Sequence, residues 1–580
     1  MKLNHLRTIG AGLSMAVLLT SCDGLGKMLK KQSDFKYTLS PSPIEMHGDS
    51  VQFGITGKFN PKIFQKKVTL TLTPVIKYAG GGEKQLKPVV LVGDKATGTG
   101  GQKISFSTGG SFSYTSEKFA FEQGMRNAKV VLTGEGQVKS KKKAFDPVDL
   151  AEGTMATSLL VRNDEKTIMA KDNFQKSYPA NQSTHIYYVI NQSTVRPTEM
   201  NSEEMKAVTD FISKNLSNPW YEFKGISVSA YASPDGETDK NENLAKDRAN
   251  SASAAMMSQF AKNKDKAVTF GKTKDQFAVG TTREDWEGFK AAMEQSTMAD
   301  KDLILRVLTM YSDADQRRKE IKNLSKTYEE LANNVLPKLR RAEISINADK
   351  KSRTDEMISR LAVSNPDSLS VEELLYAGTL TNDLITLTQI YRSAEKQYGS
   401  DWRTSNNLGC VLLAQNKLSE ASEAFNRAAK AAPSEGAVAN NQGIIEARNG
   451  NRAAAMELYK KAGGAKETKY NMGIIEVRQG KYADAVTDFG SYNGHNKALA
   501  QLLSGNAGQV KETIGASAEK DAAYSLYLKA VASARQGNTP DAITNLKAAI
   551  EKDNSYKAYA KDDVEFLKLR SDANFTGMVN

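Results

Sequence analysis

One spacing of small and aromatic residues recurs along the last third of the chain and limits its fold more than any other feature. Gly409, Ala421, Phe425 and Ala428 are followed by Pro433, and the same offsets return 34 residues later. The later sets are Gly443, Ala455, Tyr459 and Ala462; Gly473, Ala485, Phe489 and Tyr492; and Ala530, Ala542, Leu546 and Ala549. A small residue on one helix lets a second helix approach, and an aromatic residue on the second fills the space between hairpins. The spacing therefore predicts stacked helical hairpins, none of which can bury its apolar face alone.

These offsets resemble the tetratricopeptide repeat, and the resemblance implies an α-helical solenoid over residues 366–580. The pattern residues themselves are expected to be core. The concave groove of such a solenoid would be lined by other positions of the first helices, and four asparagines occupy such positions: Asn407, Asn440, Asn441 and Asn471. They either line a groove for a protein partner or are solvated surface.

The N-terminus has the pattern of a signal peptide: a basic start, an apolar run over residues 9–18, and small residues before Cys22. The run is too short to span a bilayer. Leu19-Thr20-Ser21-Cys22 resembles the lipobox of bacterial lipoproteins, in which the cysteine is acylated and becomes the new N-terminus. The resemblance implies that residues 1–21 are removed and that Cys22 joins the chain to outer-membrane lipid. An ordinary secretory signal is the alternative.

Residues 22–34 are expected to be a short basic tether between the lipid and the first domain. The chain resembles envelope lipoproteins of the Bacteroidota, in which surface display is associated with an acidic stretch after the cysteine. Here one early aspartate is followed by three lysines. By that resemblance, the protein is anchored on the periplasmic side of the outer membrane.

Composition suits several soluble domains. Of the 580 residues, 39% are hydrophobic and 25% are charged, and no second long apolar run appears. Removal of residues 1–21 takes away Lys2 and Arg7 and lowers the net charge from +12 to +10. A basic chain favours anionic lipid or cell-wall polymer as a partner. Its expected export excludes nucleic acid, which lies in the cytoplasm.

The sequence contains no recognisable catalytic or metal-binding arrangement. Its two cysteines are Cys22 and Cys410, so acylation of Cys22 leaves no disulfide within the chain. Four scattered histidines lack metal-ligand spacing, and no nucleophile triad, carboxylate pair or phosphate loop stands out. We therefore expect no catalytic residue, no metal, no cofactor and no enzymatic activity.

Residues 35–150 alternate β-branched and polar residues, as in Val68 to Val75 and Lys129 to Gly134. Glycine clusters such as Gly80-Gly81-Gly82 separate the runs. Short strands at this spacing predict an antiparallel β-sandwich. Such a domain is either a spacer or an adhesion-like module, and a glycan site on its loops is the alternative.

Residues 181–350 follow a β-α-β-α order. A strand is expected at His185 to Ile190, a helix from about Ser202 to Leu216, a strand at Ile226 to Ala230, and a helix from Asn243 to Phe260. This order implies helices packed on a sheet. Helical spacing between residues 284 and 331 predicts an inserted group of helices before the last strand.

A nine-residue stretch of this region, Asn241 to Ala249, resembles the N-x-x-L-S-x-x-R-A helix of OmpA-like peptidoglycan-binding domains. Asn241, Leu244, Arg248 and Ala249 match, and Ala245 replaces the serine. Arg340-Arg341 before an alternating apolar run fits the closing strand of that family. The resemblance implies an α+β domain in which Arg248 binds a carboxylate of the peptide stem, a role that suits a guanidinium fork.

The sequence departs from this family at one important position. The family places an aspartate eight residues before the motif asparagine, and Ser233 stands there. A serine can hydrogen-bond the stem but cannot pair with its ammonium group, whereas Asp235 and Asp239 are close enough to substitute. The candidate peptidoglycan-binding residues are therefore Arg248, Asn241, Ser233 and Asp235. Alternatively, Arg248 makes a structural salt bridge and the domain is a wall-inactive scaffold.

Together these features describe a multidomain, non-catalytic lipoprotein, and three functional hypotheses remain open. In the first, the repeats scaffold an envelope protein and the OmpA-like domain contacts peptidoglycan. In the second, the chain is an accessory subunit of an outer-membrane assembly or secretion machine without peptidoglycan binding. In the third, it is a surface lipoprotein that captures glycans through its β domain.

Overall fold

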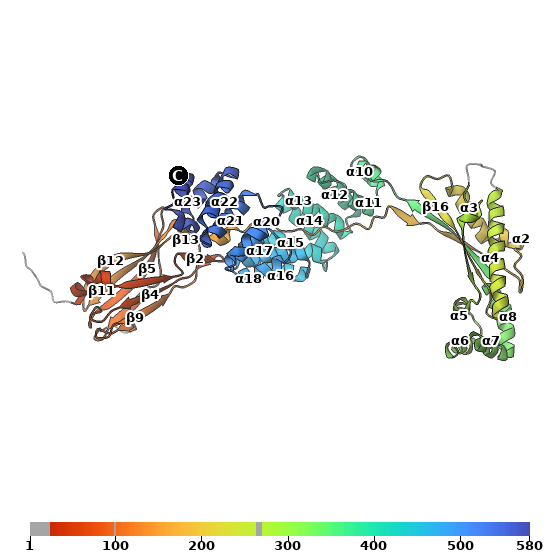
Figure 1. Cartoon of the computed structure of the whole chain (residues 1–580), viewed down its shortest axis with the longest axis horizontal. Helices are drawn as coiled ribbons and strands as arrows, with labels where there is room; N and C mark the ends of the chain where they lie inside the picture. Colours follow the sequence, from red (N-terminus) through yellow and green to blue (C-terminus); the bar gives the residue numbers. More distant parts are fainter. Residues whose placement is uncertain (1–23, 98–99, 263–268) are drawn as a thin grey trace, which may run out of the picture. The chain divides into compact units, whose positions relative to one another are not determined.

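The computed structural model describes residues 24–97, 100–262 and 269–580 (Figure 1). The chain divides into two compact units. Unit 1 combines the chain up to Ala170 with Tyr398–Asn580, and unit 2 is the intervening stretch Lys171–Gln397. In the sequence, unit 2 is therefore an insertion within unit 1.

The N-terminal part of unit 1 is β-rich, with its described strands in three sheets. The strand orders are β1-β4-β9, β10-β3-β2-β13 and β12-β11-β5-β7-β8, and β6 pairs with β5. The strands are β1 (Lys36–Ser40), β2 (Ile44–His47), β3 (Ser50–Val51), β4 (Gly54–Phe59), β5 (Thr69–Lys77), β6 (Glu83–Gln85), β7 (Val89–Gly93), β8 (Gln102–Ile104), β9 (Gly110–Thr115), β10 (Phe119–Ala120), β11 (Lys129–Val138), β12 (Lys141–Glu152) and β13 (Thr154–Met155). Alternating residues of these strands share one core, which includes Phe59, Leu70 and Phe112.

Most strand pairs of this region are antiparallel, but β2 pairs with β13, and β7 with β8, in parallel. The prediction of an antiparallel sandwich over residues 35–150 is therefore wrong at the β7–β8 pair, whereas β13 lies just beyond that range. In neither pair does a tight hairpin turn join the strands, and only such turns require antiparallel neighbours.

The segment expected to be a tether packs on this β core. Helix α1 (Gly24–Leu29) buries Leu25 and Met28 completely. Gln32 exchanges hydrogen bonds of 2.6 and 3.1 Å with the main chain of Asp146. From Gly24 onward, the segment predicted to be a tether is therefore packed against the first domain, because two apolar side chains on one helix face enter the core.

The C-terminal part of unit 1 is a succession of helices that pair into hairpins (Figure 1). They are α13 (Trp402–Ala414), α14 (Leu418–Ala431), α15 (Gly436–Arg448), α16 (Arg452–Ala462), α17 (Lys466–Arg478), α18 (Tyr482–Phe489), α19 (His495–Leu503), α20 (Val510–Gly515), α21 (Ala523–Arg535), α22 (Thr539–Lys552), α23 (Ser555–Asp562) and α24 (Ala573–Val579). The predicted close approach within hairpins is visible at the glycines. A Cβ atom at Gly409 or Gly443 would lie 2.4 or 2.5 Å from the ring of Phe425 or Tyr459. A small residue is thus required opposite each aromatic ring.

Unit 2 contains a sheet of order β14-β18-β16-β17, with β15 also pairing with β18. Its strands are β14 (Ser177–Pro179), β15 (Gln182–Tyr187), β16 (Tyr221–Tyr231), β17 (Phe277–Thr282) and β18 (Arg341–Lys351). Helices α3 (Glu203–Asn215) and α4 (Thr238–Ala261) pack on one face of the sheet through an apolar core. Along β18 the buried residues Ala342, Ile344 and Ile346 alternate with polar ones, so the opposite face is polar.

Further helices of unit 2 stand between β17 and β18 and after β18 (Figure 1). They are α5 (Trp286–Glu294), α6 (Lys301–Met310), α7 (Ala314–Asn323), α8 (Ser325–Asn334), α9 (Leu336–Leu339), α10 (Asp355–Ser364), α11 (Val371–Ala377) and α12 (Leu384–Tyr398), and a short helix α2 (Pro197–Met200) precedes α3. Helices α5 to α9 surround a separate small core that includes Phe289 and Leu331. The predicted helical insertion is thus a distinct cluster with its own apolar centre.

Candidate functional site

A row of buried asparagines crosses the first helices of successive repeat hairpins. Their side chains come from α13, α15, α17 and α19 and are at most 1% exposed: Asn406, Asn407, Asn440, Asn441, Asn471 and Asn496. The alternative that these asparagines are solvated surface is therefore wrong. Asn406 and Asn496, which sequence reasoning missed, belong to the same row. A signal was present for Asn406, since the pair Asn406-Asn407 recurs one 34-residue repeat later as Asn440-Asn441.

The asparagines bind an extended segment of the same chain, residues 161–170. The side chain of Asn407 accepts a hydrogen bond from the N–H of Ala170 at 2.7 Å and donates one to the C=O of Ala170 at 2.9 Å. Asn441 does the same for Ile168, with both distances 2.9 Å. Each amide side chain thus matches both main-chain groups of one residue, as a neighbouring β-strand would.

The same clamp is repeated further along the groove. Asn471 pairs with the N–H and C=O of Lys166 at 2.7 and 2.9 Å. Asn496 pairs with those of Arg162 at 2.9 and 3.0 Å. Because the main chain is extended, alternate residues face the asparagines. The groove therefore recognises a strand-like conformation.

Neighbouring asparagines hold one another in the clamping orientation. Asn441 donates to the side-chain oxygen of Asn406 at 2.9 Å, and Asn471 to that of Asn440 at 3.1 Å. Asn440 adds a second donor to the carbonyl of Lys166 at 3.0 Å. The row is a connected polar network that is satisfied only when an extended main chain lies in the groove.

Side chains of the repeats contact the acidic part of the segment. Arg448 lies 3.1 Å from the carboxylate of Glu165, whose side chain is 3% exposed. Tyr470 donates to Asp164 at 2.7 Å. Burial, followed by the charge of Asp164, raises the pKa of Tyr470, so the hydroxyl stays protonated and remains a donor. These contacts add charge selectivity to the recognition of the main chain.

The beginning of the segment is fixed by the last repeats. Val161 is buried in the repeat core. His495 lies 2.8 Å from the carbonyl of Leu160 through Nε2. Burial lowers the pKa of His495 to about 4, so the ring is neutral and this contact requires the tautomer that carries its proton on Nε2.

In unit 2, Arg248 is 1% exposed, and its guanidinium faces main-chain carbonyls. It donates to Gln192 at 3.1 Å, to Tyr231 at 3.0 Å and to Val189 at 3.4 Å. None of these contacts is the salt bridge to Asp247 or Glu242 that the sequence suggested as the alternative. Its donors therefore join the ends of β15 and β16 to α4.

The other candidate residues lie beside Arg248 and contact one another. Asn241 donates to the carbonyl of Ser233 at 3.0 Å. The hydroxyl of Ser233 accepts from Arg340 at 3.2 Å, and Asp235 lies 3.4 Å from the same guanidinium. The structure thus brings Ser233, Asp235 and Asn241 together, and it adds Arg340, which the sequence had placed only as part of the closing strand.

Asp235 is one of the residues that line a cleft of about 630 Å³. Its Oδ1 is buried and finds no hydrogen-bond partner among the residues that the structure describes. The cleft is lined by charged and amide side chains of both signs: Asn191, Asp235, Glu237, Lys240, Asp315, Arg318, Lys319, Lys322 and Asn323. A lining that carries both signs of charge suits a ligand with both an ammonium and a carboxylate group.

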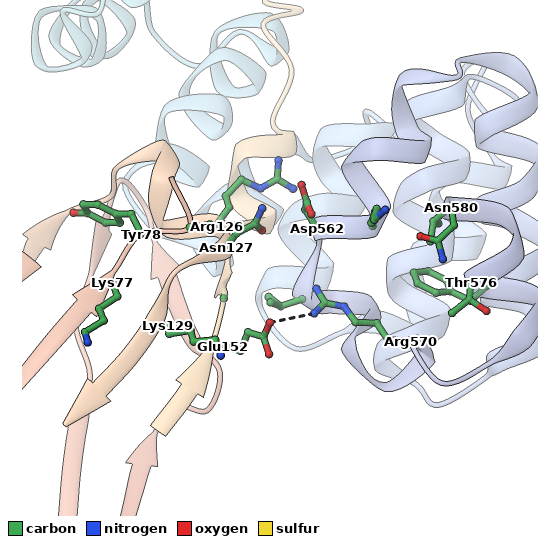
Figure 2. A pocket seen from close by; sticks show the side chains of 16 residues that line it. Lys77, Tyr78, Arg126, Asn127, Lys129, Glu152, Asp562, Arg570, Thr576 and Asn580 are labelled. Atoms are coloured by element: carbon green, nitrogen blue, oxygen red, sulfur yellow. Dashed lines mark ion pairs between the residues drawn. The ribbon is translucent and has the colours of Figure 1, made fainter. Parts of the chain in front are cut away.

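A second cleft, of about 600 Å³, lies where the β sheets of unit 1 meet its C-terminal helices (Figure 2). Figure 2 shows Arg570 pointing toward Glu152, and these charged groups are 3.9 Å apart. Arg126 stands 3.8 Å from the ring centre of Tyr559. Because two of its cations are engaged by neighbours within unit 1, the mixed lining indicates a packing boundary rather than a site for one class of ligand.

Cys22, the predicted lipidation site, lies outside the described residues. Cys410 is buried, and burial raises the pKa of its thiol to about 12. Within the described ranges, no helix combines the length and apolar character needed to cross a bilayer. The same part of the chain holds no group of three or more His, Cys, Asp or Glu side chains suited to a metal ion.

Comparison with known proteins identifies the repeats. Residues 406–467 match the tetratricopeptide repeat family. Similar solved structures include PilW, a type IV pilus biogenesis factor, with 15% identity, 40% of this chain and 100% of PilW covered, and a TM-score of 0.26. A tetratricopeptide repeat protein from Parabacteroides merdae has 13% identity, 43% and 99% coverage, and a TM-score of 0.28. YrrB, a repeat protein with an unusual peptide-binding site, has 17% identity, 36% and 99% coverage, and a TM-score of 0.21. No curated protein matches the chain. The C-terminal helices of unit 1 are thus a tetratricopeptide-repeat region.

Proposed function

We propose that this chain is a non-catalytic, lipid-anchored scaffold of a bacterial envelope that recruits another envelope protein through its tetratricopeptide repeats. The observation that carries the proposal is the asparagine row, which binds an extended polypeptide through its main chain. Repeat solenoids use such concave surfaces for protein partners. The lipobox-like run that ends at Cys22 and the lysines after it support a location on the periplasmic side of the outer membrane.

Crosslinking in intact cells tests the recruitment. The full chain is crosslinked, purified from membranes, and compared with a chain that lacks residues 398–580. We expect the same envelope protein to be captured repeatedly with the full chain and lost with the truncated one. Equal capture by both chains would contradict recruitment through the repeats. Protease added to intact cells tests the orientation, since digestion would place the chain on the cell surface.

A second candidate function is contact with peptidoglycan through unit 2, which resembles OmpA-like domains around Asn241 and Arg248. Support comes from Asp235, which lines a cleft and supplies the carboxylate that Ser233 lacks, with one oxygen that has no hydrogen-bond partner among the described residues. Against it, Arg248 already donates to three carbonyls. The accessory-subunit alternative, without peptidoglycan binding, follows if the Asp235 cleft takes no stem peptide.

Cosedimentation with insoluble peptidoglycan separates these alternatives. The soluble chain with Cys22→Ala should sediment, and Asp235→Asn should release it. Loss of a charge-assisted contact costs about 1.5–3 kcal/mol, or roughly ten- to a hundredfold in affinity. Asp239→Asn is the matched control, because this exposed aspartate lies outside the cleft lining. A wild-type chain that stays in the supernatant would leave recruitment by the repeats as the function.

A further inference from the structure

The groove lined by the asparagine row recognises its occupant mainly through hydrogen bonds to the main chain. Eight main-chain groups, the N–H and C=O of Arg162, Lys166, Ile168 and Ala170, are bound by asparagine side chains. Every extended peptide carries the same groups at the same two-residue spacing. The clamps therefore fix conformation and direction but leave the sequence largely free.

The occupant contributes little apolar burial. Val161 is buried, but residues 162–170 are half-buried or exposed, and Met169 is 42% exposed. The polar groups of the segment can bond to water when they leave the groove, so their hydrogen bonds contribute little net free energy. Extensive apolar burial would instead hold the segment permanently. The segment can therefore leave the groove locally without unfolding the repeats.

Sequence preference comes from two adjacent acidic residues. Asp164 accepts from Tyr470 and from Asn496, the latter at 2.7 Å, and Glu165 pairs with Arg448. Tyr470, Asn496 and Arg448 belong to the repeats and stay in place when the segment leaves. The groove therefore favours an extended peptide with an Asp-Glu pair directly before a clamped position.

We propose that residues 162–170 are a built-in, displaceable occupant, and that the partner protein binds by laying an extended segment with two adjacent acidic residues in their place. This inference rests on the proposed recruitment through the repeats and adds its site and its chemistry. The chain's own segment then keeps the groove closed until a partner segment displaces it.

A labelled peptide tests the exchange. The probe is a fluorescent decapeptide with the sequence of residues 161–170 and blocked ends, and its anisotropy is followed as the full soluble chain is added. Asp164→Asn together with Glu165→Gln weakens the built-in occupant but leaves the groove intact. We expect the probe to bind this double variant at least tenfold more tightly than wild type. A probe with Asn-Gln in place of its acidic pair should bind at least tenfold more weakly.

Groove and control variants are made on the double-variant background. Asn440→Ala with Asn441→Ala should abolish probe binding, whereas Asn426→Ala, at an exposed position on α14, should leave it unchanged. No binding to the folded double variant, or equal binding with and without the groove asparagines, would overturn the proposal. If a crosslinked partner is nevertheless captured through the repeats, the proposed recruitment remains supported, but the partner binds a surface of the repeats other than the groove.

Hydrogen exchange on the unmodified chain gives a test that requires no variant to fold. The amides of Lys166, Ile168 and Ala170 should exchange at least tenfold faster than those in the middle of α13 and α15, because they open locally. Exchange of these three amides only together with the helices would make the segment a permanent part of the core and refute displacement.

Discussion

At the scale of single residues, Arg248 holds the main chain of unit 2 together. Replacing it with Met keeps the apolar stem but removes the three donors and leaves the carbonyls of Val189, Gln192 and Tyr231 unpaired. We expect the free energy of unfolding of unit 2 to fall by about 3 kcal/mol or more. Chemical denaturation of the full chain measures the loss, and Lys246→Met, at an exposed position on the same helix, is the control. Unchanged stability with lost peptidoglycan sedimentation would make Arg248 a binding residue instead.

Glu476 introduces a pH dependence into the repeats. Its carboxylate is buried, with Oε2 lacking a hydrogen-bond partner among the described residues. Burial, followed by the charges of Asp488 and Asp484, raises the pKa of Glu476 to about 7. The pKa of Glu476 is higher in the folded state than in the unfolded state. Its contribution to the stability of the repeats is therefore fully present below about pH 4.5 and is lost as the pH rises through about 7.

Glu476→Gln should therefore protect the repeats at alkaline pH. The amide keeps the size of the side chain but cannot ionise, so we expect a gain of about 1–3 kcal/mol at pH 8 and little change at pH 4. Thermal melts across this range give the difference between variant and wild type. Glu423→Gln, at an exposed position on α14, should show no such trend. A gain for Glu476→Gln that is equal at both pH values would refute the assignment.

At the scale of helices, the glycine opposite each aromatic ring sets the distance within a hairpin. Gly443→Ala improves helix propensity but places a Cβ 2.5 Å from the ring of Tyr459. We expect a net loss of about 1–3 kcal/mol in the stability of the repeats. Gly577→Ala in α24 is a matched control, because its Cβ would meet nothing within 4 Å and helix propensity alone favours alanine. Equal effects of the two changes would show that hairpin packing tolerates the methyl group.

The sequence predicts the hairpins because their determinants are local. Gly409 and Phe425 belong to neighbouring helices, and their spacing recurs with the repeat. Residues 162–170 lack such a signal, since they show no regular period and their partners are distant: Ala170 and Asn407 are 237 residues apart. Asn407, Asn440, Asn441 and Asn471 could be proposed as groove residues from the sequence, but what they bind could not. Likewise, the motif around Arg248 predicts a helix but not the carbonyls that surround its guanidinium.

At the scale of the whole molecule, the proposed attachment to the membrane depends on Cys22. Cys22→Ala should move the chain from the membrane fraction to the soluble periplasmic fraction and abolish labelling by a fatty-acid probe. Cys410→Ala, which removes the buried thiol instead, should leave both unchanged. Fractionation followed by immunoblotting reports the result. A Cys22→Ala chain that still partitions with membranes and labels with the probe would refute lipidation.

In the sequence, unit 2 is inserted between residues 162–170 and the helices of their groove. This insertion determines the order in which the parts of the chain can fold. Arg162 must find Asn496 across 334 residues, and closing so long a loop has an entropic cost before any contact forms. Unit 2 is one uninterrupted stretch and can fold as soon as it is available. We expect the segment to be the last part of the chain to become ordered.

Pulse-labelled hydrogen exchange during refolding checks this order. The amides of Lys166, Ile168 and Ala170 should gain protection after those of α15 and α17, and protection of the segment before the helices would contradict the expected sequence of events. A newly synthesised chain then passes through an interval in which its repeats are formed and its groove is open. A partner segment present during that interval has no built-in occupant to displace, so the timing of folding and assembly decides which of the two fills the groove first.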